Sequence, residues 1–328
     1  GTNAARKGMA ADLPPGEWAV KRFDIVARET ATLAEAAAGR FVFDSPASRA
    51  VLFVFTRNAA PPPSRPLSRL RVSANGRFLE TMDGRPFFWL GDTSWALIQR
   101  AAREDRLDQP SATRYFANRA AKGFNVIQCR AVSDAATEDV YGRPAFHDRD
   151  FARPRVLPGV DDDYWDTADW FVAEARRHGI YLALLPIWAA SVPNEDKLAE
   201  DPATAYRYGR FLGGRYAREP HLIWVLGGDA PKDRDVDNPK RMALTRAMAE
   251  GIADGVNGTE GFDGKADYST TLMTYHPRGG GQSSSRLLHN EEWLDFNMIQ
   301  TTTRMGFTNY EIVAEDYART PAKPTLDA

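Results

Sequence analysis

An aspartate follows a buried hydrophobic run in the second half of the chain. Residues 222–229 have the sequence LIWVLGGD, so the run ends in two glycines and then presents Asp229. Such a run is typical of a parallel strand covered on both faces, and barrel enzymes carry their catalytic groups at the carboxyl ends of such strands. An Asp after a strand can also cap the next helix. The polar segment 230–235 shows no helical periodicity, which favours a catalytic carboxylate at the rim of a barrel.

Polar and aromatic side chains also end the other predicted strands. Carboxylates and amides can hydrogen-bond pairs of sugar hydroxyls, and aromatic rings stack on the apolar C–H faces of a sugar. Each residue alone has a structural alternative, because a tryptophan can belong to the core and a glutamine can fill an interior layer. Repeated polar side chains at one end of a barrel are nevertheless costly unless they are functional. The sequence therefore predicts a carbohydrate pocket, lined by Asp92, Trp95, Gln128, Trp188, Tyr275, His276 and Gln300.

Strands and amphipathic helices alternate from about residue 86 onward. The predicted strands are 86–92, 124–130, 180–188, 222–229, 270–276, 294–300 and 323–328, and the predicted helices are 112–122, 164–178, 203–217, 240–252 and 310–317. This alternation favours an α/β fold, a (β/α)8 TIM barrel, over an open sheet. One strand of eight is missing, so we expect the barrel to be C-terminally incomplete in this chain. No glycine-rich phosphate-binding fingerprint follows the first strand, which counts against a dinucleotide-binding fold.

The first 66 residues have a different pattern. Short strands are predicted at 18–27, 40–44 and 50–56, and the proline-rich segment 59–66 is expected to be a stiff linker. We therefore divide the chain into a small β-rich N-terminal segment, residues 1–66, and a barrel domain, residues 67–328. The Asn75–Gly76 pair then predicts a hairpin that closes the bottom of the barrel.

Six segments in combination resemble the apiosidase-like glycoside hydrolases. They are PFFWLGDTSW at 86–95, RAAKGFNVIQ at 119–128, IWVLGGD at 223–229, MTYHPRGG at 273–280, WLDFNMIQ at 293–300 and YARTPAKPTLD at 317–327. The resemblance runs from about residue 70 to the end. It implies a (β/α)8 barrel that hydrolyses a glycosidic bond in a plant or related polysaccharide and retains the anomeric configuration by means of two carboxylates.

The same resemblance implies roles for those two carboxylates. The family's acid/base matches Asp229, and its nucleophile is a Glu shortly after the KPTLD motif, beyond Ala328. The chain departs from the family where Ala-Pro-Lys follows Asp229 in place of Arg-Asn-Pro, and where three threonines follow Gln300 in place of Ser-Gly-His. The segment 131–160 is long and rich in Asp and Arg, which indicates specialised outer subsites. These departures bear on which sugar is bound and leave the reaction type unchanged.

Composition excludes several other classes of function. The formal net charge is −2 and no basic stripe is present, so no nucleic-acid partner is expected. No apolar run approaches the length needed to span a membrane. The single cysteine, Cys129, lies in an apolar run and is expected to be a packed thiol. We expect a periplasmic or secreted protein with a carbohydrate substrate and no cofactor.

Three alternatives stay open at this point. A metal-dependent hydrolase would use Asp92, Asp229 and His276, although the five histidines show no ligand spacing and no metal is expected. A non-catalytic carbohydrate-binding protein would keep the cleft without a second carboxylate. Residues 279–286 are expected to form a flexible loop, and a serine there with His289 is a further possible nucleophile, although no G-x-S-x-G elbow is present.

Overall fold

The computed structural model describes residues 6–12, 17–24, 29–37, 40–45, 51–58, 67–104, 111–159, 163–191, 201–230, 235–301 and 309–327 of the 328-residue chain. The chain divides into two compact units, Gly1–Pro63 and Ser64–Ala328. The boundary lies three residues before the one expected from the sequence. The predicted linker at 59–66 falls outside the described residues.

The described residues of the N-terminal unit form five strands in two antiparallel sheets. They are β1 (Arg6–Asp12), β2 (Glu17–Asp24), β3 (Glu29–Ala37), β4 (Arg40–Ser45) and β5 (Val51–Asn58). β1 pairs with β4, and β2 lies between β3 and β5. The sequence predicted only β2, β4 and β5. β3 has the sequence ETATLAEAA, whose alanines and glutamates favour a helix locally, and its pairing with β2 overrides that preference.

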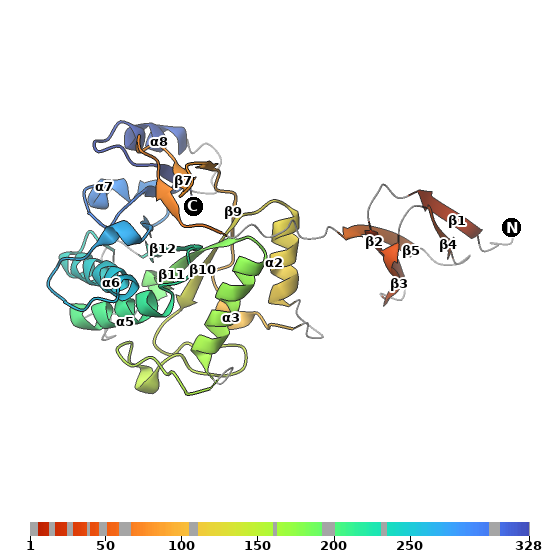
Figure 1. Cartoon of the computed structure of the whole chain (residues 1–328), viewed down its shortest axis with the longest axis horizontal. Coiled ribbons are helices and arrows are strands. Elements are labelled where there is room, and N and C mark those ends of the chain that lie inside the picture. Colours follow the sequence, from red (N-terminus) through yellow and green to blue (C-terminus); the bar gives the residue numbers. More distant parts are fainter. Residues whose placement is uncertain are drawn as a thin grey trace. The chain divides into compact units, whose positions relative to one another are not determined.

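Five parallel strands form the main sheet of the second unit. They are β9 (Gly91–Thr93), β10 (Val126–Val132), β11 (Tyr181–Ile187), β12 (Leu222–Gly227) and β13 (Met273–His276), in the order β13-β12-β11-β10-β9. The connecting helices are α1 (Leu97–Arg100), α2 (Ala112–Ala121), α3 (Tyr164–Arg177), α5 (Pro202–Arg215) and α6 (Pro239–Asn257). Figure 1 shows β10, β11 and β12 side by side with helices packed around them. This is the curled sheet of a (β/α)8-type barrel, as the sequence predicts.

A second sheet continues the barrel after β13. β15 (Asn297–Gln300) pairs in parallel with β16 (Thr325–Asp327) and antiparallel with β14 (Gln282–Ser283). β13 is tied to the start of β15, because the Asp295 amide donates to the Met273 carbonyl at 2.9 Å and the Thr274 hydroxyl donates to the Phe296 carbonyl at 2.6 Å. α7 (Ser285–Leu288) and α8 (Asn309–Tyr317) complete this part. In the ranges given above, the strands do not close into a ring, since β9 and β16 are edges.

The alternation of side chains along the strands creates two hydrophobic cores. Val126 of β10 and Val225 of β12 belong to an interior core, whereas their neighbours Ile127 and Trp224 belong to an outer core beneath the helices. Both faces of these strands are therefore buried, which is what the continuous apolar runs predict. The alternation also decides which strand residues can face the mouth of the barrel.

A short antiparallel sheet covers one end of the interior core. β6 (Leu70–Val72), β7 (Leu79–Thr81) and β8 (Pro86–Phe87) form it, and Gly76 turns between β6 and β7 with φ +69°. Leu70 and Leu79 pack into the interior core beside Tyr181. The hairpin predicted at Asn75–Gly76 is confirmed.

The predicted strand 86–92 is wrong as a single element. β8 pairs with β7, whereas β9 pairs with β10. The strand is interrupted between β8 and β9 at Phe88, which is 79% exposed. The Asn125 side chain joins the two sides of the break, donating to the Phe88 carbonyl at 2.7 Å and accepting from the Leu90 amide at 2.9 Å. One apolar run therefore contributes strands to two different sheets. Its hydrophobicity alone does not show where the first strand ends and the second begins.

α5 and α6 pack with their backbones in close contact. A Cβ on Gly213 of α5 would lie 2.1 Å from the Ile252 carbonyl oxygen, and a Cβ on Gly251 of α6 would lie 2.2 Å from the Tyr206 carbonyl oxygen. Only glycine fits these positions, because side chains there would overlap main-chain atoms. α5 itself is capped by Asp201, whose carboxylate accepts from the Ala203 and Thr204 amides, and Pro202 occupies its first turn.

No helix in the described part of the chain is long and apolar enough to cross a membrane.

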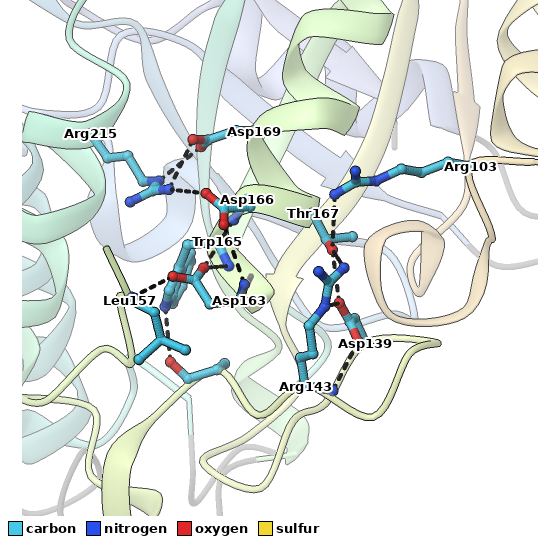
Figure 2. Close-up of polar contacts among 11 residues, drawn as sticks. Arg103, Asp139, Arg143, Leu157, Asp163, Trp165, Asp166, Thr167, Asp169 and Arg215 are labelled. Carbon is cyan, nitrogen blue, oxygen red and sulfur yellow. Dashed lines mark hydrogen bonds and ion pairs between the residues drawn. The ribbon is translucent and has the colours of Figure 1, made fainter. Parts of the chain in front are cut away.

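The long segment after β10 is anchored to the start of α3. The Asp163 carboxylate caps α3 through the Trp165 and Asp166 amides and also accepts from the Leu157 amide at 2.6 Å (Figure 2). Trp165 Nε1 donates to the Ala145 carbonyl at 2.9 Å.

A second anchor joins the same segment to the side of α3. Thr167 of α3 donates to Asp139 Oδ2 at 2.8 Å, and Asp139 also forms an ion pair with Arg143 (Figure 2). Asp139 and Arg143 of this segment therefore help to hold it against α3. The specialised subsites that the length and composition of this segment indicated stay a prediction.

Candidate active site

Side-chain alternation divides the predicted site residues into two groups. On β10, Ile127 and Cys129 lie in the outer core, so Gln128 faces inward. On β13, Tyr275 lies in the outer core, so His276 faces inward. Gln300 ends β15, two residues beyond Met298 of the interior core, and therefore faces inward as well.

Trp95, Trp188 and His276 form an aromatic cluster at the strand ends. The ring centroids lie 4.6 Å apart for the two tryptophans, 5.3 Å for Trp95 and His276, and 5.4 Å for Trp188 and His276. Both tryptophans pack against the interior core and stay partly exposed. Edge-to-face and tilted contacts of this kind fix the ring orientations, which leaves a rigid apolar wall for a ligand.

Asp229 lies at the end of β12 in an uncommon backbone conformation. Gly227 and Gly228 have φ +86° and +121°, and Asp229 itself has φ +49°. A Cβ on Gly228 would lie 2.8 Å from Trp188 Cε3, so the turn requires glycine there. Non-glycine residues in the left-handed region are uncommon and cluster at functional sites.

The surroundings of Asp229 argue against a helix-capping role. α6 begins ten residues later and is capped by Asn238, which accepts from the Lys240 amide at 3.0 Å. The Asp229 side chain is exposed and its Oδ1 accepts from the Gly279 amide at 2.9 Å. Its Oδ2 has no hydrogen-bond partner among the described residues. One carboxylate oxygen is therefore held in place while the other is available to a ligand.

Three buried polar atoms of the inward-facing group have no hydrogen-bond partner in the described part of the chain. They are Gln128 Oε1, His276 Nδ1 and Gln300 Oε1. Gln128 is 4% exposed and His276 is 2% exposed. Buried polar groups are almost always hydrogen-bonded, and leaving one unpaired costs about 1–3 kcal/mol. Sugar hydroxyls, which both donate and accept, would satisfy all three.

The charge state of His276 follows from its environment. Burial lowers the pKa of His276, and the negative charge of Asp229 opposes this shift without reversing it. The imidazole is therefore neutral near pH 7, with one ring nitrogen able to donate and the other able to accept.

Asp92 and Tyr275 lie in the helix-facing layer, which differs from the expectation that they line the pocket. Asp92 stands in register with the outward-facing Ile127, forms an ion pair with Arg119 and accepts from the Tyr115 hydroxyl at 2.8 Å. The Tyr275 hydroxyl donates to the buried carboxylate of Asp235. The sequence identified the strand ends correctly, but adjacent residues on a strand point to opposite faces and only the register decides which one faces the mouth.

Arg130 was not singled out from the sequence. It lies two residues beyond Gln128 on the same face of β10, and its amide donates to the Trp95 carbonyl at 3.1 Å. Arg130 Nε is buried without a hydrogen-bond partner among the described residues, and burial lowers the pKa of this side chain. The two-residue spacing from Gln128 is the signal that could have identified it.

Residues 279–281 form a turn, and the residues that follow do not form the flexible loop that the sequence suggested. They enter β14 and α7, with Ser283 and Ser285 buried and both hydroxyls donating to Asp316. His289 Nε2 lies 2.8 Å from the Pro321 carbonyl oxygen instead of contacting a serine. The serine nucleophile is therefore not supported.

The described residues also give little support to a metal site. Within the ranges given above, no group of three or more His, Cys, Asp or Glu side chains could hold a metal ion. The metal-dependent alternative requires Asp92, which is bound to Arg119 and Tyr115. Asp92 faces the helices, whereas His276 faces the interior of the barrel.

The strand ends of this barrel combine an exposed carboxylate, an aromatic wall and amide oxygens without hydrogen-bond partners among the described residues. These are the features of a carbohydrate-active domain. Comparison with known proteins gives the family. Residues 73–328 match the family described as "Apiosidase-like, catalytic domain". Because this match covers most of the chain, the protein belongs to the apiosidase-like glycoside hydrolase family.

Individual relatives agree with this assignment. A glycoside hydrolase family 5 structure from Bacteroides vulgatus is 30% identical, with a TM-score of 0.65 over 79% of this chain and 53% of that chain. A second structure, described as a glycoside hydrolase, is 28% identical with a TM-score of 0.63, over 79% of this chain and 56% of its own. Mannan endo-1,4-beta-mannosidase 3 of Oryza sativa subsp. japonica is 22% identical over 272 residues, which are 68% of this chain and 55% of the rice protein. The chain spans about half the length of these relatives.

Proposed function

We propose that this protein hydrolyses a glycosidic bond in a plant-type or related polysaccharide or oligosaccharide, with Asp229 as the acid/base. The observation that carries the proposal is the position of the Asp229 carboxylate. It is exposed at a strand end, held through Oδ1 by the Gly279 amide, in a site where buried amide and imidazole atoms lack partners. Protonated Asp229 would donate to the leaving oxygen, and deprotonated Asp229 would then activate water.

The proposed mechanism retains the anomeric configuration, which requires a second carboxylate. The family resemblance assigns that role to a Glu that follows Asp327 along the chain. In a retaining enzyme its carboxyl group is expected about 5–5.5 Å from that of Asp229, whereas a separation of about 6.5–9.5 Å would indicate inversion.

The remaining inward-facing residues support sugar recognition in this proposal. Trp95 and Trp188 would form one wall of the innermost pocket, against the C–H face of the ring. Gln128, His276 and Gln300 would bond its hydroxyls, which satisfies the atoms that lack partners. Since a polymeric substrate does not enter cells, we propose that the protein acts in the periplasm or outside the cell.

A substrate screen tests the proposal. The full-length protein is incubated with a panel of aryl glycosides and plant cell-wall polysaccharides, including mannan and apiose-containing glycans, with and without a chelator. We expect release of sugar from at least one class of substrate, at a rate that the chelator does not change. A rate abolished by the chelator and restored by a divalent metal would instead support the metal-dependent alternative. Binding of glycans without turnover would support the non-catalytic one.

A further inference from the structure

Gly279 differs from the other glycines around the candidate site. Gly227 and Gly228 have positive φ values, and a Cβ on either would lie within 2.8 Å of a neighbouring atom, so the fold itself requires glycine there. Gly279 has no positive φ, and a Cβ on it would meet no atom of the described residues closer than 3.6 Å. Neither backbone conformation nor packing therefore demands a glycine at position 279.

The space beside Gly279 lies between two groups of the candidate site. An ideally placed Cβ there would lie 3.7 Å from Asp229 Oδ1, 3.6 Å from Gln300 Cδ and 3.7 Å from Gln300 Nε2. These are ordinary van der Waals distances, so a methyl group at this position would touch the carboxylate and the amide at the same time.

We propose that Gly279 is a residue of the sugar-binding site, whose missing side chain leaves room for the sugar between Asp229 and Gln300. This inference rests on the proposed function. The Gly279 amide holds the Asp229 carboxylate, and the bare Cα lets a substituted sugar ring approach the same carboxylate. A side chain at position 279 would keep the hydrogen bond, which comes from the backbone, and remove the space.

The test is the substitution Gly279→Ala in the full-length protein, with Gly261→Ala as the matched control. Gly261 is also a loop glycine without positive φ, and nothing lies within 4 Å of a Cβ placed there. We expect Gly279→Ala to melt at the wild-type temperature and to lower kcat/KM at least tenfold. The loss should be the same for substrates with good and with poor leaving groups, because space and not proton transfer is removed. Gly261→Ala should leave kcat/KM unchanged.

Each other outcome overturns the inference in a recognisable way. Wild-type kcat/KM in Gly279→Ala would show that the space is not used by the substrate. A loss confined to poor leaving groups would show that the substitution acts through Asp229, and a failure to fold would show that the fold requires the glycine. An absence of hydrolysis by the wild-type protein on every glycan would instead overturn the proposed function, and the inference with it.

Discussion

The close approach of α5 and α6 predicts opposite effects for two adjacent glycines. A Cβ on Gly213 would lie 2.1 Å from the Ile252 carbonyl oxygen, 2.9 Å from its carbonyl carbon and 3.0 Å from its Cα. All three are main-chain atoms, so the helices must move apart to accommodate it. A Cβ on Gly214 would come no closer than 3.7 Å, to the Gly255 carbonyl oxygen.

The free energies follow from helix propensity and packing. Alanine in place of glycine stabilises a helix by up to about 1 kcal/mol, so Gly214→Ala, in the last turn of α5, should raise the free energy of unfolding by up to about that amount. Gly213→Ala has the same gain in helix propensity, but its Cβ overlaps the backbone of α6. Such overpacking typically costs about 1–3 kcal/mol, and more when backbone atoms are involved. We expect a net loss of about 2 kcal/mol, which separates the two variants by about 3 kcal/mol.

Thermal and urea unfolding of the two variants beside the wild type measure this difference. For a domain of this size, 3 kcal/mol corresponds to about 6–12 °C in the melting temperature. Gly214→Ala should melt above the wild type and Gly213→Ala below it. Equal shifts of the same sign would contradict the close helix contact, since propensity alone would then account for both.

Two further predictions concern groups whose burial is costly. Burial lowers the pKa of His221 to about 4, so on acidification the unfolded state takes up a proton before the folded state does. The free energy of unfolding should therefore fall by up to about 3 kcal/mol as the pH drops from 6.5 toward 4. Urea unfolding between pH 4 and 7 measures this slope, which should be shallower in His221→Asn; identical slopes would contradict the assignment. Arg130→Met removes a half-buried cation whose Nε has no hydrogen-bond partner among the described residues, and it should raise the free energy of unfolding by about 1 kcal/mol while lowering glycan hydrolysis. Thermal melts and the substrate assay test it, and a lower melting temperature with unchanged hydrolysis would show that Arg130 serves the fold.

Continuous apolar runs made most of the barrel predictable. β11 and β12 are buried on both faces, and the helices between the strands have caps and apolar faces that are visible in the sequence, such as Asp163 and Asp201. Element positions depend on such local signals, which is why the observed boundaries lie within a few residues of the predicted ones for most elements.

The errors arose where long-range pairing decides the structure. β3 becomes a strand against its local preference because β2 offers a partner, and the run at 86–92 divides because its two halves pair with different sheets. Asp92 and Tyr275 were assigned to the pocket because they occupy strand ends, but strand register turns both toward the helices. Gly279 lies in the segment 273–280 that carries the family resemblance, but the space beside it depends on the fold and is not visible in the sequence.

The measurement that tests the central claim most directly is the leaving-group dependence of Asp229→Asn in the full-length protein. Asn is nearly isosteric, tolerates the left-handed conformation found at position 229 and can still accept from the Gly279 amide, so the melting temperature should not change. Glycosides with poor leaving groups need protonation most. The account predicts that their turnover falls by orders of magnitude in Asp229→Asn, while aryl glycosides with good leaving groups lose far less. Equal turnover of a natural glycan by the variant and the wild type would remove Asp229 from the mechanism.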